Sequence, residues 1–105
     1  MLVEVNTDRN IQNSERLISY CKSTIEAELA RFDEHITRVE VHLSDENGAK
    51  GGDDDKRCLI ETKLKGKSPV AVKNNASNID DAISGAIDKI TKVLETSLDK
   101  MRSHH

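Results

Sequence analysis

The alternation of apolar and polar residues along the chain predicts four short strands. Residues 2–5 indicate the first. Residues 36–43 and 57–65 alternate apolar and polar side chains, which is typical of strands that bury one face. Residues 68–73 predict a fourth strand at an edge of the sheet, because Pro69 has no N–H to donate to a neighbouring strand. The pattern therefore favours a sheet with one apolar face and one polar face.

Two longer stretches repeat apolar residues every three or four positions and predict helices. The first is expected to begin with a cap at Asn13 or Ser14 and to end near Phe32. The second is expected over residues 79–102. Its apolar stripe consists of Ile79, Ile83, Ala86, Ile87, Ile90, Leu94, Leu98 and Met101.

The order β-α-β-β-β-α predicts an α+β two-layer sandwich, a four-stranded mixed sheet with both helices on one face. We expect strands one and two to be parallel through a right-handed crossover, and strands two to four to form an antiparallel meander. We expect a single domain over residues 1–102, followed by a frayed tail at 103–105.

The composition narrows the classes of function. A net charge of −3 argues against a general DNA or RNA binder, whose affinity depends on neutralising phosphates. Residues 1–52 hold 6 basic and 10 acidic side chains, whereas residues 53–105 hold 10 and 9. No apolar run approaches the roughly 20 residues that a membrane span needs, and two distant cysteines suggest reduced thiols in the cytoplasm.

Basic residues gather on two predicted surfaces. On the last helix, Lys89, Lys92, Thr96 and Lys100 share one flank, and Asp81, Asp88, Glu95 and Asp99 lie beyond it. This flank is either a solvated helix face with acid–lysine pairs or a surface that contacts phosphates. The outward face of the sheet is expected to carry Arg38, Arg57, Lys63, Lys65 and Lys73, with no aromatic side chain for stacking on bases.

Catalytic, metal and cofactor sites are not expected. His35 and His42 are the histidines inside the predicted fold, and neither has the spacing of a hydrolase triad. The loop of residues 44–56 contains Asp45, Asn47, Asp53, Asp54 and Asp55, but its spacing does not match a calcium loop, and we expect it to be mobile. Cys21 and Cys58 are expected to be buried side by side as small apolar residues, with a regulatory disulfide as the less favoured alternative.

Three segments in this order resemble the ribosome hibernation promoting factors and ribosome-associated inhibitors, also described as sigma-factor modulation proteins. The segments are R-V-E-V-H-L-S-D-E-N-G (38–48), D-K-R-C-L-I-E-T-K-L-K-G-K-S-P-V-A-V (55–72) and I-D-D-A-I-S-G-A-I-D-K-I-T-K-V-L (79–94). The resemblance covers nearly the whole chain and implies a fold like that of double-stranded RNA-binding domains. It also implies the short form of the family, which lacks a dimerising domain.

The resemblance implies a stress-responsive translation inhibitor without enzymatic activity that occupies the decoding groove of the small ribosomal subunit. In such proteins, basic side chains on the helices and the sheet contact ribosomal RNA phosphates. Lys89 and Lys92 match basic positions of the last helix, and Lys100 and Arg102 match its basic end. On the sheet, the expected RNA-binding residues are Arg38, Lys63, Lys65 and Lys73. The alternative is a protein-interaction module that binds a protein partner through the open sheet face or the edge strand.

Overall fold

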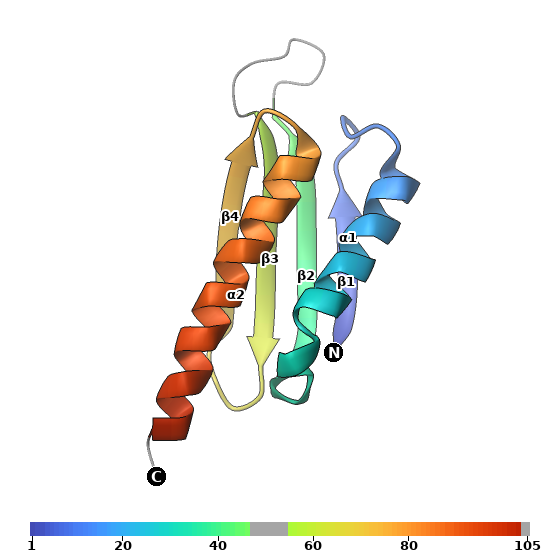
Figure 1. The fold of residues 1–105 in the computed structure, drawn as a ribbon. Helices are drawn as coiled ribbons and strands as arrows, with labels where there is room; N and C mark the ends of the chain where they lie inside the picture. The colour runs from blue at the N-terminus through green and yellow to red at the C-terminus, as the bar shows by residue number, and fades with distance from the viewer. Residues whose placement is uncertain (47–54, 104–105) are drawn as a thin grey trace.

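The computed structural model of the chain describes the backbone of residues 1–46 and 55–103 and the side chains of residues 1–46 and 55–98. Its four strands form one sheet in the order β1-β2-β3-β4, and both long helices cover the same face of that sheet (Figure 1). The predicted α+β class and the order β-α-β-β-β-α are confirmed. The elements are β1 (Leu2–Thr7), α1 (Ser14–Glu28), the 3₁₀ helix η1 (Ala30–His35), β2 (Ile36–Asp45), β3 (Lys56–Leu64), β4 (Val70–Ala76) and α2 (Ile79–Ser103).

The strand pairing agrees with the predicted topology. β1 runs parallel to β2, with Val3 opposite Val39. β2 and β3 are antiparallel, as are β3 and β4, so the predicted meander is confirmed. β4 has β3 as its neighbour and lies at the edge of the sheet, as expected from Pro69. The register matters for function because it decides which charged side chains of neighbouring strands lie next to one another.

The core is built almost entirely from aliphatic side chains. Aromatic residues are 2% of the sequence, and Phe32 is the aromatic residue that the described core contains. Strand residues that alternate toward the helices meet the apolar stripe of α2 and the inward side of α1. The fully buried members include Cys21, Ile25, Leu29, Val39, Val41, Ile60, Thr62, Ile83, Ile90 and Leu94.

Two boundaries differ from the prediction by three residues or more, and several strand ends differ by one or two residues. α1 ends at Glu28, and a 3₁₀ helix rather than a continued α-helix reaches Phe32. Leu29 and Phe32 are both buried, and the N–H of Phe32 donates to the carbonyl of Leu29 at 2.9 Å, so a three-residue period turns both side chains inward. β4 continues to Ala76, where a loop was expected, because residues 74–76 remain paired with β3.

The starts of the two helices are capped differently. The N–H of Asp81 donates to Oδ1 of Asn78 at 2.8 Å, so Asn78 is the N-cap of α2. Asn13 occupies the N-cap position of α1, but its φ is 56° and its side chain makes no capping hydrogen bond. The side chain of Asn13 therefore leaves the first N–H groups of α1 uncapped.

A close contact between β4 and α2 sets the distance between helix and sheet. Nδ2 of Asn74 donates to the carbonyls of Asp81 and Ala82, each at 3.3 Å. Gly85 lies over this amide: a Cβ at residue 85 would stand 2.1 Å from Nδ2 of Asn74. The absence of a side chain at Gly85 lets β4 and the first turns of α2 approach one another.

We expect Gly85→Ala to destabilise the protein, although alanine favours an α-helix by about 1 kcal/mol over glycine. The new methyl group must displace Asn74, and the loss of its two hydrogen bonds outweighs the helix gain by a net amount on the order of 1 kcal/mol. Urea denaturation measures the difference, with the exposed neighbour Ser84→Ala as control. A gain in stability for Gly85→Ala equal to the helix-propensity difference would contradict this role of Asn74.

Candidate nucleic-acid interface

The apolar stripe of α2 faces the sheet, and Lys89 and Glu95 lie on opposite sides of that stripe. On one side, Nζ of Lys89 donates to the backbone carbonyl of Lys73 in β4 at 2.9 Å. On the other side, Arg31 forms an ion pair with Glu95, and so α2 is bound to η1. Lys89 therefore lies beside the edge strand, and Glu95 faces η1.

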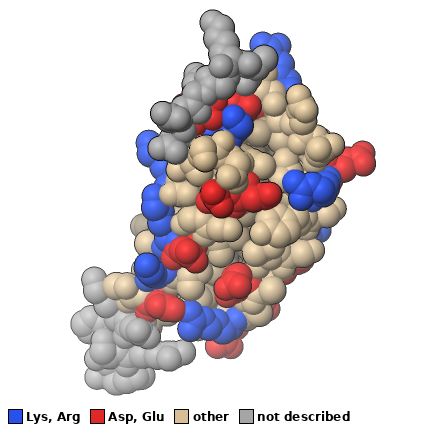
Figure 2. All heavy atoms as spheres, turned by 45° about the horizontal axis from the view of Figure 1, so that its top comes forward, with Lys and Arg blue, Asp and Glu red and all other residues tan. Residues whose placement is uncertain are grey.

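Four exposed lysines form what we call the lysine edge. Lys73 comes from β4, Lys89 and Lys92 come from α2, and Lys67 comes from the turn between β3 and β4. Nζ of Lys67 donates to the carbonyl of Ser97 at 3.3 Å, which joins this turn to α2. Figure 2 shows lysine and arginine side chains in a row along one long edge of the molecule, and acidic side chains over the middle of the same view.

Two acidic side chains of α2 lie close to arginines of α1 and η1. Asp80 lies 3.9 Å from the guanidinium of Arg16, and Glu95 pairs with Arg31. Both pairs are exposed and each contributes at most about 1 kcal/mol to stability. Their importance is in the charge pattern, because they hold carboxylates away from the lysine edge.

The open face of the sheet differs from the lysine edge because its arginines are paired. Arg38 lies 2.5 Å from a carboxylate oxygen of Glu4 and 2.8 Å from one of Glu40. Arg57 lies 2.6 Å from a carboxylate oxygen of Glu46. The expected outward positions of Arg38 and Arg57 are confirmed, but their charges are balanced by neighbouring glutamates.

Two other predicted basic residues are exposed at or near the end of β3. Lys63 is exposed in β3 opposite Arg38, and Lys65 is exposed just after β3 ends. The side chains of Lys100 and Arg102 lie outside the described residues. Lys67 was absent from the predicted contacts, because nothing in the sequence indicated that its turn reaches α2.

Lys56 forms ion pairs with Asp45 and Asp55, which lie at the two ends of the acidic segment of residues 45–55. Its Nζ lies 2.7 Å from Oδ1 of Asp55 and 3.4 Å from Oδ1 of Asp45. The hydrogen bond to Asp55 is the main reason that the pKa of Lys56 is raised above its usual value. Asn47, Asp53 and Asp54 lie outside the described residues. Within the described part of the chain, no group of three His, Cys, Asp or Glu residues is placed to hold a metal ion.

The two cysteines are reduced and buried. Cys21 in α1 and Cys58 in β3 are both fully inaccessible to solvent. Burial raises the pKa of Cys21 to about 12. Burial is also the main cause of the raised pKa of Cys58, and the neighbouring Cys21 contributes to it. Both thiols are therefore neutral apolar groups of the core at physiological pH, as expected from their positions.

Comparison with known families identifies the chain. The family described as sigma 54 modulation protein / S30EA ribosomal protein matches residues 5–102. The chain belongs to this family. It is a family of non-enzymatic, ribosome-associated modulation proteins, in agreement with the resemblance seen in the sequence. A comparison with curated proteins found no match.

Solved structures share the fold at low sequence identity. The N-terminal domain of Thermus thermophilus Protein Y is 22% identical, with a TM-score of 0.64, over 91% of this chain and 98% of that one. A ribosomal subunit interface protein from Coxiella burnetii is 17% identical, with a TM-score of 0.66, over 98% of this chain and 99% of that one. No helix in the described part of this chain is long and apolar enough to cross a membrane.

We expect both thiols of the folded protein to resist alkylation by iodoacetamide at pH 8. A pKa raised from 9.0 to about 12 lowers the thiolate fraction of Cys21 at this pH about a thousandfold, and burial blocks access further. Mass spectrometry should show both thiols modified in denaturant, whereas Ser19→Cys on the exposed side of α1 should react without it. Rapid modification of folded Cys21 would contradict its burial.

The same pKa shifts predict the effect of alkaline pH on stability. Below pH 9 the thiols are protonated in both the folded and the unfolded protein, so the full stability is present. Between pH 9 and 12 the unfolded thiols lose protons while folded Cys21 keeps its own, so the free energy of unfolding should fall as pH rises. Urea denaturation across this range measures the fall, and Cys21→Ala should reduce its size.

Proposed function

We propose that this protein inhibits translation in the cytoplasm by binding the small ribosomal subunit near its decoding sites. Membership of a ribosome-associated family supports a ribosomal partner. The observation that carries the proposal is the hydrogen bond from Lys89 to the carbonyl of Lys73, which brings the basic flank of α2 to the edge of the sheet. Lysines from three elements thereby form one surface that can follow an RNA backbone.

The chemistry of the lysine edge suits phosphate groups. Each ammonium group has three N–H donors, and the bonds from Lys67 and Lys89 to backbone carbonyls use one donor on each. These bonds limit the freedom of two flexible side chains before RNA arrives, which reduces the entropy lost on binding. The remaining donors are available for phosphate oxygens. We therefore expect contacts with the RNA backbone rather than with base edges.

The separation of charge explains how a protein with net charge −3 can bind RNA. The acidic flank of α2 faces α1 and η1, where Asp80 and Glu95 approach arginines. At physiological ionic strength, repulsion between exposed charges is screened over about 8 Å. The carboxylates on the far flank therefore weaken the attraction of the lysine edge less than the net charge suggests.

We propose that the other predicted residues extend this interface. Lys63 and Lys65 lie near the β3–β4 turn, and Lys100 and Arg102 belong to the end of α2. Arg38 is expected to contribute least, because Glu4 and Glu40 must release its guanidinium before a phosphate can bind it.

We expect Lys89→Glu combined with Lys92→Glu to abolish co-sedimentation with small ribosomal subunits at moderate salt. Two attractive charges become repulsive, and each lost phosphate contact should also reduce the slope of log affinity against log salt by about 1. Both side chains are exposed, so the fold should be kept. Co-sedimentation over a potassium chloride series measures affinity and slope.

Lys22→Glu is the matched control, because Lys22 is an exposed lysine on α1, away from β4. Lys22→Glu changes the net charge by the same amount as either single substitution in α2. It should leave co-sedimentation with the small subunit nearly unchanged. Lys63→Glu tests the open sheet face. Loss of pelleting in Lys63→Glu but not in the α2 variant would move the RNA contact to the sheet. No pelleting of the unaltered protein at low salt would refute ribosome binding and favour a protein partner instead.

A further inference from the structure

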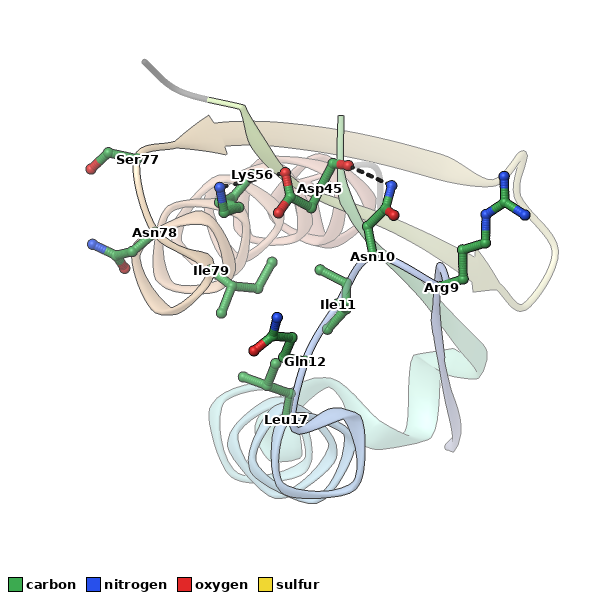
Figure 3. Close-up of a pocket in the computed structure, with 10 residues that line it drawn as sticks. All are labelled: Arg9, Asn10, Ile11, Gln12, Leu17, Asp45, Lys56, Ser77, Asn78 and Ile79. Carbon is green, nitrogen blue, oxygen red and sulfur yellow. Dashed lines mark hydrogen bonds and ion pairs between the residues drawn. The ribbon is translucent and has the colours of Figure 1, made fainter. Parts of the chain in front are cut away.

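A pocket at one end of the sandwich lies apart from the lysine edge. It has a volume of about 470 Å³ and is bounded by the segment before α1, the end of β2, the start of β3 and the segment before α2. Figure 3 shows Ile11, Gln12 and Ile79 pointing toward one another across it, with Leu17 beyond Gln12 and Lys56 on the opposite side. The volume is in the range that binds small organic molecules.

The apolar surface of the pocket comes from branched aliphatic side chains. Ile11 and Ile79 are partly buried against the core, and Leu17 is buried within it. Such a surface binds the flat apolar faces of a ring and gains free energy as water is displaced. The pocket therefore favours a planar body over a fully hydrated ion.

Polar groups at the pocket provide directional recognition. The carboxamide of Gln12 makes no hydrogen bond with any other described residue, so both its donor and its acceptor can meet a ligand. Lys56 is held in place by Asp55 at 2.7 Å and Asp45 at 3.4 Å, and its third N–H can donate to a bound group. A ligand must therefore present both acceptors and donors on its edge.

Arg9 adds a positive charge at the rim. It borders the pocket, but its side chain is exposed and in Figure 3 extends away from the centre. It forms no ion pair with any other described residue, so its fork of N–H groups can bind a phosphate outside the pocket. A ligand with a planar ring for the pocket and an anionic group for Arg9 at the rim has the chemistry of a nucleotide.

We propose that this pocket binds a nucleotide, with the base between Ile11 and Ile79, the base edge on Gln12 and the phosphate on Arg9. A carboxamide pairs with both a donor and an acceptor of a base edge, as in the contacts of glutamine with adenine. The nucleotide is either free in solution or an unpaired residue of an RNA strand. The site uses none of the lysine edge, so it can exist whether or not the protein binds ribosomes.

The test is a titration of ¹⁵N-labelled protein followed by NMR. AMP, GMP, CMP and UMP are added separately, and then a short single-stranded oligoribonucleotide and a fully paired RNA duplex. Saturable shifts of the Gln12 side-chain amide and the Ile11 and Ile79 backbone amides with a mononucleotide would establish the free-nucleotide source. The same shifts with the single strand only would establish an unpaired RNA residue as the ligand. No shift of these signals with any of the ligands overturns the proposal.

Variants test the assigned contacts. Arg9→Glu should weaken whichever of these nucleotides binds by about tenfold and leave binding of the matching nucleoside unchanged, since the phosphate alone meets Arg9. Gln12→Leu should weaken both the nucleotide and the nucleoside. Lys22→Glu is the control for charge, and both Lys22→Glu and the Lys89→Glu, Lys92→Glu variant should bind mononucleotides normally. Equal nucleotide affinity of Arg9→Glu and the unaltered protein would overturn the assignment of the pocket to nucleotides.

Discussion

Burial of one sheet face beneath the apolar stripe of α2 is the constraint on which the rest of this structure depends. The core has little aromatic bulk, so its stability comes from close packing of isoleucine, leucine and valine. Close packing requires the helix to approach the sheet, and Gly85 over Asn74 permits this approach. Once Ile83, Ile90 and Leu94 are buried, α2 can no longer rotate about its own axis without exposing them.

The fixed orientation of α2 about its axis directs Lys89 toward β4 and Glu95 toward η1. The lysines of α2 lie beside β4, and Lys89 reaches the carbonyl of Lys73. Asp80 lies near Arg16 of α1, and Glu95 pairs with Arg31 of η1. A sheet with one covered face thus produces a basic edge on a protein of net negative charge. The proposed RNA contact and the stability of the core depend on the same helix orientation.

Much of the fold could be predicted from local pattern. Strict alternation in residues 36–43 placed Val39 and Val41 in the core, and the edge position predicted for β4 is confirmed, although Pro69 precedes the strand. The continuation of β4 to Ala76 could not be predicted, because Asn74 and Asn75 have low strand propensity and are held there by pairing with β3. The 3₁₀ helix at Phe32 was missed because Leu29 and Phe32, three residues apart, lie on one face of an α-helix as well as of a 3₁₀ helix.

The sequence by itself determined the class of fold, the membership of the family and the segregation of lysines and acids along α2. These follow from periodicity and residue type, which are local properties of the chain. Only the tertiary structure decided that Lys67 and Lys73 join the flank of α2, that Arg38 is paired with two glutamates, and that Gln12 and Ile79 face one pocket. Each of these depends on residues far apart in sequence, and only the packing of the sheet against the helices brings them together.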